Sequence, residues 1–427
     1  MTAAILSRRR GVCPGLSAPM ATGDGLLVRL TPTGTMPLDA FTALCAAAQR
    51  HGSGIIEVTA RGNIQVRGLT PDSAPRFASA VAALDIAAAD GIPVLTNPLA
   101  GLDPDELIDA AALAAELRRA LTQRALGSRL AAKASVVIDG GGSLGLDDIA
   151  ADVRLCAVAG NGPALRIALG GDAANAGQLG MVALGDGIAA VARLLETVAA
   201  FGPQVRARDV VGEGDLVAFR SAVADLIIGK APPHAAHPGV EAIGVHWLRD
   251  GTFAYGVGLA FGHADATSLQ RLAAAADAAG ARGLRAAAGR VLMIIGLAQP
   301  ALSSVAAAAE NLGFIVRTDD PRRHVVACAG APLCASGHIA TRAIGPAVAA
   351  AAAAHLDGAF QIHISGCAKG CAHPAPAPLT LVGTPDGCAL VAAGSARDAC
   401  FAVVAIDDLS ATIAKIAGDV RRDVRDV

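Results

Sequence analysis

The amino-acid sequence predicts a duplicated α+β and α/β protein, in which each half is a small α+β unit followed by a larger α/β unit. The main observation is a repeat: the stretch 24–69 recurs as 250–297, at an offset of 226 to 228 residues. Both copies read strand, loop, helix and strand, with the helices expected over 37–51 and 266–279. Self-similarity on this scale indicates that one structural unit occurs twice.

The segments that follow each copy also repeat. Residues 134–140 (Ala-Ser-Val-Val-Ile-Asp-Gly) match 360–366 (Phe-Gln-Ile-His-Ile-Ser-Gly), and each follows an alanine-rich stretch that we expect to be helical. Each then continues into a further strand, over 153–158 and 379–382. The proline-rich stretch 202–238 is expected to contain the junction between the halves.

These repeats predict four units along the chain. The expected boundaries are 1–98 for the N-terminal segment and first small unit, 99–235 for the first α/β unit, 236–300 for the second small unit, and 301–427 for the second α/β unit. A chain of 427 residues is long enough for several domains with their own cores.

Four cysteines of the second half form two close pairs, Cys328 with Cys334 and Cys367 with Cys371. Their spacings are C-x5-C and C-x3-C. A [4Fe–4S] cubane takes one thiolate at each of its four irons, so two close pairs match its need. The sequence therefore predicts that these four residues hold such a cluster.

The residues between these cysteines are mostly small, so the backbone can approach a cluster closely. Gly366 and Gly370 can take positive φ angles. Lys369 would offset part of the thiolate charge. Two alternatives remain: structural zinc, which usually takes shorter spacings, and disulfides, which need an oxidising compartment that nothing else in the sequence indicates.

The first half carries a cationic segment, 59–67, that reads Thr-Ala-Arg-Gly-Asn-Ile-Gln-Val-Arg. On a strand, alternate side chains point to one face. We therefore expect one face to present Arg61, Asn63, Gln65 and Arg67. Guanidinium groups bind carboxylates by paired, planar hydrogen bonds, and Lys133 could add a further charge. The alternative is an ordinary exposed polar sheet face.

The two halves differ in complementary ways. The first-half counterpart of the second cysteine pair, 139–142, reads Asp-Gly-Gly-Gly and has no cysteine. The second-half counterpart of the cationic segment, 287–295, reads Ala-Ala-Gly-Arg-Val-Leu-Met-Ile-Ile. Complementary losses in a duplicated protein predict one shared site at the pseudo-twofold interface, with the cluster from one half and the cationic groups from the other.

Composition excludes some classes of partner. The net charge is −2 and there is no basic tract, which argues against nucleic acid. The longest apolar run, 347–354, is too short to cross a membrane. No apolar stretch follows the arginines of 1–10, so a signal peptide is not expected. We expect a cytoplasmic protein in a reducing compartment.

Together, the C-x5-C and C-x3-C pairs, the Thr-x-Arg-x-x-x-Gln segment and the half-repeat resemble the sirohaem-dependent sulfite and nitrite reductases over nearly the whole chain. The resemblance implies two ferredoxin-like half-domains that pair, with cluster and tetrapyrrole at their interface. It further implies that Cys371 bridges cluster and haem iron, and that Arg61 and Gln65 contact the carboxylates of the macrocycle.

The chain also departs from those reductases. Their Lys-x-Lys pair is reduced to Lys133-Ala134-Ser135, and Lys-Gly stands where Asn-Gly commonly precedes the last cysteine. The stretches 10–16 (Arg-Gly-Val-Cys-Pro-Gly-Leu), 24–29 and 363–371 instead resemble the precorrin-3B synthases of aerobic cobalamin biosynthesis. In that subfamily the tetrapyrrole, precorrin-3A, is the substrate.

This closer resemblance implies an oxygen-dependent monooxygenase. It would hydroxylate precorrin-3A at C20, with the ring A acetate closing a γ-lactone on C1. Its partners would be the tetrapyrrole, O₂ and an electron donor, either NADH-linked or ferredoxin-like, and the cluster would deliver single electrons. The alternative function is a sirohaem-dependent sulfite or nitrite reductase, and sirohaem is expected only in that case.

The resemblance also implies a mononuclear non-haem iron. Such sites usually take histidines and a carboxylate. His363 and His373, which flank the second cysteine pair, are the candidate ligands, with a structural role as the alternative. His234 and His237, in the proline-rich junction, form a second pair for which a solvated junction is the preferred interpretation.

Overall fold

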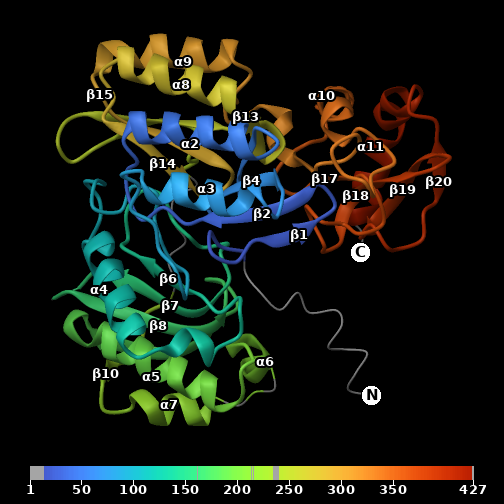
Figure 1. Ribbon diagram of the computed structural model, residues 1–427. Coiled ribbons are helices and arrows are strands. Elements are labelled where there is room, and N and C mark those ends of the chain that lie inside the picture. Colours follow the sequence, from blue (N-terminus) through green and yellow to red (C-terminus); the bar gives the residue numbers. More distant parts are fainter. Residues whose placement is uncertain (1–13, 161, 213, 215, 234–239, 426–427) are drawn as a thin grey trace.

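The computed structural model of the protein describes residues 14–425 except 161, 213, 215 and 234–239. Within that part of the chain, the strands form sheets of five, six, four and five strands. Helices α2, α8 and α9 lie together in one layer, the sheet of β6, β7 and β8 lies below with α4, α5 and α7, and the C-terminal sheet lies to one side (Figure 1).

The first small unit is a sheet in the order β1-β2-β4-β3, with β13 from the second half added at its edge. Two helices, α2 and α3, belong to this unit, and the predicted strand–helix–strand pattern of 24–69 is confirmed. The bounds are β1 (Met20–Thr22), β2 (Gly25–Leu30), α2 (Leu38–His51), β3 (Ile55–Val58), β4 (Ile64–Leu69) and α3 (Ser73–Ala82).

The second small unit repeats this pattern in the order β11-β12-β15-β14. Its bounds are β11 (Gly244–Trp247), β12 (Phe253–Gly258), β13 (His263–Asp265), α8 (Ala266–Ala278), β14 (Gly283–Ala287), β15 (Val291–Leu297) and α9 (Leu302–Asn311). The helices expected over 37–51 and 266–279 are α2 and α8, which start or end within a residue of the expected bounds.

Each small unit pairs a short backbone segment with the sheet of the other, and the two contacts are at equivalent positions. Ala264 pairs with Ile56 on the first sheet, and Met36 pairs with Leu284 on the second. Ala264 follows Met36 by 228 residues and Leu284 follows Ile56 by the same interval, so one contact is the pseudo-twofold image of the other. The repeat found in the sequence therefore corresponds to a pseudo-twofold symmetry of the interface between the two small units, which we call the joint.

Helices α2 and α8 close the same joint from above (Figure 1). Leu44 of α2 and Leu269 of α8 are fully buried in one apolar core that contains side chains of both units. The Gln49 amide also donates to the Thr267 hydroxyl at 2.9 Å. Because the core is shared, neither unit buries its apolar face without the other.

The two α/β units share one topology. Strands β5, β6 and β7 are parallel and continue into antiparallel β8, as β16, β17 and β18 continue into β19. The first unit contains β5 (Val94–Thr96), α4 (Ala110–Gln123), β6 (Val136–Asp139), β7 (Ala151–Val158), β8 (Ala164–Gly171), β9 (Gly177–Ala183), α5 (Gly187–Ala200), α6 (Ala207–Gly212), α7 (Val217–Val223) and β10 (Ile227–Gly229).

The second α/β unit is the C-terminal part of the chain. It contains β16 (Val325–Ala327), α10 (Thr341–Ala351), β17 (Ile362–Ser365), β18 (Ala377–Thr384), β19 (Gly387–Gly394), β20 (Ala402–Val404) and α11 (Leu409–Arg425). The predicted equivalence of 134–140 with 360–366 is confirmed, because β6 and β17 occupy the same place in their sheets. Among the described residues, no helix has both the length and the apolarity needed to cross a bilayer.

The exchanged strand β13 carries a histidine whose charge opposes folding. Burial, followed by the nearby Arg342 guanidinium, lowers the pKa of His263 to about 3. An unfolded histidine titrates near pH ~6.5, so between about pH 6.5 and 3 the unfolded chain binds a proton that the folded chain rejects, and stability falls as the pH is lowered.

We expect His263→Gln to flatten the fall in melting temperature between about pH 6.5 and 4, because it removes this proton uptake. The measurement is thermal unfolding followed by circular dichroism across that range. A comparison above pH ~7, where His263 is neutral in both states, corrects for any loss of packing. An unchanged slope in the variant would show that His263 does not couple protonation to the joint.

Candidate functional site

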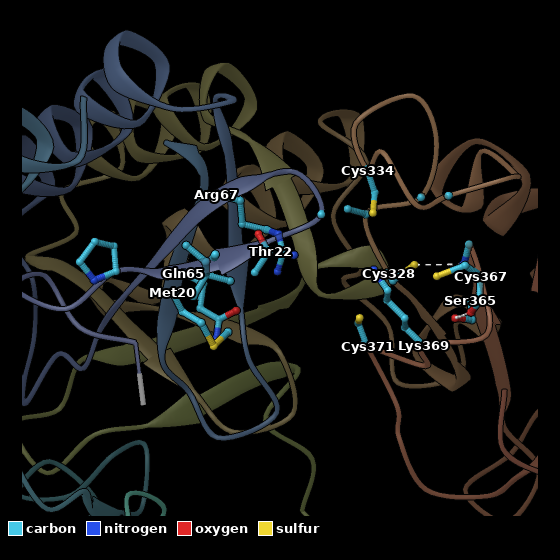
Figure 2. A pocket seen from close by; sticks show the side chains of 18 of the residues that line it. Met20, Thr22, Gln65, Arg67, Cys328, Cys334, Ser365, Cys367, Lys369 and Cys371 are labelled. Atoms are coloured by element: carbon cyan, nitrogen blue, oxygen red, sulfur yellow. Dashed lines mark hydrogen bonds between the residues drawn. The ribbon is translucent and has the colours of Figure 1, made fainter. Parts of the chain in front are cut away.

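A cavity of about 900 Å³ lies between the first small unit and the C-terminal unit. Figure 2 shows its two walls: Gln65 and Arg67 stand on one side, and Cys328, Cys334, Cys367 and Cys371 on the other. Small-molecule sites usually measure about 300–1,000 Å³. The structure thus brings the cysteines of one half and polar groups of the other to one cavity of ligand size.

The cysteines lie where two parallel strands end. Cys328 directly follows β16, and Cys367 follows β17 by two residues. The carboxyl ends of adjacent parallel strands meet at one sheet edge, which is where open α/β sheets bind ligands. The Gly366 N–H donates to the Cys328 sulfur at 3.1 Å, and the Thr341 hydroxyl donates to the Cys328 carbonyl at 2.7 Å.

Glycines make room in these loops. Gly370 has the expected positive φ of 62°, and Gly330 has 61°. Gly366 does not take a positive φ. That residue is needed for space, because a Cβ there would lie 3.1 Å from the Gly330 Cα and 3.3 Å from the Gly337 Cα.

The donor set fits a cluster. None of the four cysteines is joined in a disulfide, and burial raises the pKa of the Cys328 thiol although the Gly366 N–H opposes the rise. Within the described residues, no three His, Cys, Asp or Glu side chains lie close enough to share one metal ion. One zinc ion needs such a group, whereas a cubane takes each thiolate at a separate iron.

The β1–β2 hairpin closes the cavity over Cys334. The Ala335 N–H donates to the Gly23 carbonyl at 2.9 Å, and a Cβ on Gly23 would overlap the Cys334 sulfur. Behind the hairpin, Asp24 accepts two bonds from Arg67, at 2.6 and 2.9 Å. Burial raises the pKa of the Asp24 carboxyl, but the bonds and charge of Arg67, together with bonds from Thr22 and the backbone, lower it below its usual value.

The opposite wall is a cross-strand row on the first sheet. Arg29, Gln65 and Glu57 are register neighbours on β2, β4 and β3. The hydrogen-bonding pattern assigns the Gln65 amide oxygen to Arg29, at 2.8 Å, and its nitrogen to Glu57, at 3.1 Å. Arg67 also bonds Glu57 at 3.4 Å. Arg67 therefore lines the cavity with its charge balanced by two carboxylates.

The expectation that one strand face carries the whole cationic segment is wrong. Strand β4 begins at Ile64, and Arg61 and Asn63 belong to the turn before it, where Gly62 has a φ of 72°. Arg61 reaches the first α/β unit instead, donating to the Ala150 carbonyl at 2.9 Å and lying 3.5 Å from the Ser135 hydroxyl.

Arg61, Asn63 and Lys133 line a second cavity of about 430 Å³. Met20 and Arg29 line both cavities, so the two adjoin. Lys369, which lines the larger one, donates to the Ser336 hydroxyl at 2.8 Å. The predicted polar residues are thus divided: Gln65, Arg67 and Lys369 on the cysteine side, and Arg61, Asn63 and Lys133 on the other.

Sequence reasoning missed three arginines of these cavities: Arg29, Arg206 and Arg208. Arg206 is bound at 2.7 Å to Asp152, which is 1% exposed, so it supports the wall. The Arg208 side chain is 70% exposed and lines the second cavity. Arg29 follows an apolar run, 26–28, and neither it nor Arg206 and Arg208 belongs to a sequence pattern that indicated a site.

The histidine candidates meet as a pair. His363 is 1% exposed, and its ring centre lies 5.7 Å from that of His373 in a T-shaped contact. Burial, followed by His373, lowers the pKa of His363 to about 4, so its ring is neutral at pH 7. In the described part of the chain no third ligand type joins them, and an iron site here stays a prediction. His234 and His237 lie outside the described residues.

In the other half, the position equivalent to that of the cysteine-lined cavity is filled by side chains. Asn97 follows β5 as Cys328 follows β16, and it accepts the Gly140 N–H at 3.0 Å as Cys328 accepts that of Gly366. Met293 lies 228 residues after Gln65 and is fully buried with Leu99 in an apolar cluster. Of the two equivalent positions in the described part of the fold, the one beside the cysteines is therefore an open cavity and the other is filled by an apolar cluster.

Comparison with known proteins first defines the class. Residues 18–84 match the nitrite/sulfite reductase ferredoxin-like half domain. A solved structure of the Mycobacterium tuberculosis NirA protein has a TM-score of 0.74 at 21% identity, covering 93% of this chain and 81% of that chain. The fold is thus that of the sulfite and nitrite reductases, with two paired ferredoxin-like half-domains and two α/β units.

Two curated relatives refine the class. Sulfite reductase (ferredoxin) 2 of Mycolicibacterium paratuberculosis is 26% identical over 360 residues, 77% of this chain and 64% of that protein. The precorrin-3B synthase of Sinorhizobium sp is 39% identical over 421 residues, 98% of this chain and 90% of that protein. The chain belongs to the precorrin-3B synthase family, a family of enzymes.

We expect Gly23→Ala to reduce cluster retention, because the new methyl group competes with the Cys334 sulfur for space. A free thiol could rotate away, whereas a sulfur bound to iron has little freedom to move. The measurement is iron and acid-labile sulfide per chain after anaerobic purification. Gly358→Ala is the matched control, because nothing lies within 4 Å of a Cβ there. Equal iron content in both variants would contradict the close packing of hairpin and cluster.

Proposed function

We propose that this protein is an oxygen-dependent precorrin-3B synthase of cobalamin biosynthesis. It would bind precorrin-3A, hydroxylate it at C20 and let the ring A acetate close a γ-lactone on C1. The observation that carries the proposal is the shared cavity, in which four cysteines face Arg29 and Gln65 and which adjoins a second cavity rich in cations. The family relationship supports the same function.

The four cysteines would hold the [4Fe–4S] cluster that supplies single electrons when bound. The chain's own contribution is to fix its ligands. Gly366 donates its N–H to the Cys328 sulfur, which favours the thiolate form. Lys369 adds a positive charge at the cavity wall. The hairpin at Gly23 packs directly against the Cys334 sulfur and so restricts its position.

The cationic groups would bind and orient the carboxylates of the substrate. Arg29 lies at the meeting point of the two cavities, and Arg61, Lys133 and Arg208 line the smaller one. Guanidinium groups recognise carboxylates through paired hydrogen bonds, which fix orientation as well as position. A macrocycle in the larger cavity would thus extend carboxylates into the smaller one.

The reaction balances with an external electron donor. One atom of O₂ enters the product and the other leaves as water, which requires two electrons and two protons. We propose that a ferredoxin-like or NADH-linked donor supplies the electrons.

We also propose that the chain is divided into four domains, 1–98, 99–235, 236–300 and 301–427. Each of these segments contains most or all of the strands of one sheet.

A sirohaem-dependent reductase is the second candidate, because sulfite reductases are recognisable relatives. Both candidates use the same cavity and differ in what the tetrapyrrole does there. A reductase retains it as a prosthetic group through purification. The protein from anaerobic purification would then show an intense haem-like visible spectrum, whereas our proposal expects only the broad absorbance of an iron–sulfur cluster.

The deciding experiment is to incubate anaerobically purified protein with precorrin-3A and a reductant, admit ¹⁸O₂ and determine the product mass. We expect one labelled oxygen atom in the product, and none when labelled water replaces labelled dioxygen. Cys367→Ser removes one thiolate and is expected to lose both the cluster and turnover. An unlabelled product, or a fully active variant without iron, would overturn the proposal.

We expect Arg29→Ala and Arg61→Ala each to weaken precorrin-3A binding about tenfold or more, because a charge-assisted hydrogen bond contributes about 1.5–3 kcal/mol. Binding is measured by fluorescence or absorbance titration under anaerobic conditions, with cluster absorbance as the check on integrity. Arg76→Ala, on the exposed face of α3, is the matched control. If all three variants bind equally, the carboxylate assignment is wrong.

A further inference from the structure

Arg342 joins the C-terminal unit to the first small unit beside the cysteines. It is the second residue of α10, directly after Thr341, whose hydroxyl bonds the Cys328 carbonyl. Its Nη2 donates to Glu57 of β3 at 2.9 Å. The Arg342 side chain is only 14% exposed and that of Glu57 is 20% exposed. This contact therefore crosses the same interface as the cavity.

The guanidinium of Arg342 is not fully satisfied by the protein. Within the described part of the chain, its Nε and Nη1 have neither a hydrogen-bond partner nor contact with solvent. A buried donor without a partner costs about 1–3 kcal/mol, and more for a charged group. Burial also lowers the pKa of Arg342, with opposing electrostatic contributions from Glu57 and Cys328. A further negative charge nearby would offset this cost.

Positive charge is in excess around this point. Arg67 and Arg342 share Glu57, and Arg67 is also bound to Asp24. Arg290 is buried and lines, together with Glu57, Cys328 and Cys371, a cavity of about 230 Å³ behind the cysteines. Three guanidinium groups thus surround two carboxylates, which leaves one uncompensated positive charge next to the thiols.

The other half of the molecule lacks this arrangement. Helix α4 takes the place of α10, and its second residue is Ala111 where α10 has Arg342. Arg285 lies 228 residues after Glu57, so the carboxylate is also replaced. Among the described residues, the Arg342–Glu57 pair therefore has no counterpart at the equivalent positions of the other half.

We propose that Arg342, held in place by Glu57, is a positioning residue that supplies a buried counter-charge to the four thiolates and so sets the reduction potential of the cluster. The inference rests on the proposed function only in requiring that the cluster is bound. Reduction adds one negative charge to the cluster. A cation in a poorly solvated place favours that charge strongly, and a neighbouring carboxylate opposes it.

Opposite signs for two variants make the test specific. Arg342→Met should make one-electron reduction about tenfold less favourable, which corresponds to a shift of about 59 mV to more negative potential. Glu57→Gln should shift the midpoint in the positive direction, because it removes a negative charge while the arginines remain. The midpoint is measured by redox titration of the full-length holoprotein, followed by electron paramagnetic resonance.

Two further variants separate charge from packing. Arg342→Lys keeps the charge and loses the fork of donors, so its midpoint should stay closer to wild type than that of Arg342→Met. Arg118→Met is the matched control: Arg118 is a partly buried arginine on α4 of the other half, and its Nε also has no partner among the described residues. It should lose stability and leave the midpoint unchanged.

Each outcome has a defined meaning. A wild-type protein without iron and sulfide overturns both the proposed function and this inference. A bound cluster whose midpoint moves equally in Arg342→Met and Arg342→Lys, or stays at the wild-type value in Arg342→Met, overturns this inference alone. If Arg342→Met fails to fold, Glu57→Gln still decides, since a negative or absent shift contradicts the assignment.

Discussion

The reciprocal strand contact between the two ferredoxin-like half-domains is the constraint on which the rest of the structure depends. The two strand contacts, Ala264 with Ile56 and Met36 with Leu284, are related by the pseudo-twofold symmetry. The apolar core above them contains side chains of both halves. Because both faces of this joint are buried together, the orientation of each half-domain is fixed relative to the other. That orientation turns the Arg29–Gln65–Glu57 row toward the unit that carries the cysteines.

Duplication creates two equivalent places, and the side chains decide which one remains open. On one side Gln65 and Arg67 face cysteines, and on the other Met293 and Ile295 pack with Leu99 in a closed core. An apolar cluster of this kind stabilises the joint through burial. The polar cavity lacks that contribution, and ion pairs such as Arg67 with Asp24 hold its wall instead.

Much of the site's chemistry could be predicted from the sequence because its ligands lie close together along the chain. The two cysteine pairs are such a case. The role of Arg67 could not be predicted in this way, because Asp24 and Glu57 approach it only through strand pairing. Arg29, Arg208 and Arg342 are isolated in the sequence, so no local pattern marked them. The turn at Gly62 also interrupted an alternation that the sequence indicated.

The sequence by itself determined the duplication, the order of helices and strands, and the types of group available for chemistry, because periodicity and short motifs are local properties. The tertiary structure decided which arginines face the cavity and which carboxylates neutralise them. It also decided which of two equivalent places is filled. These contacts join residues that are distant in the sequence, 43 positions apart for Arg67 with Asp24 and 285 for Arg342 with Glu57. They form only when the strands have paired and the interface between the halves has closed.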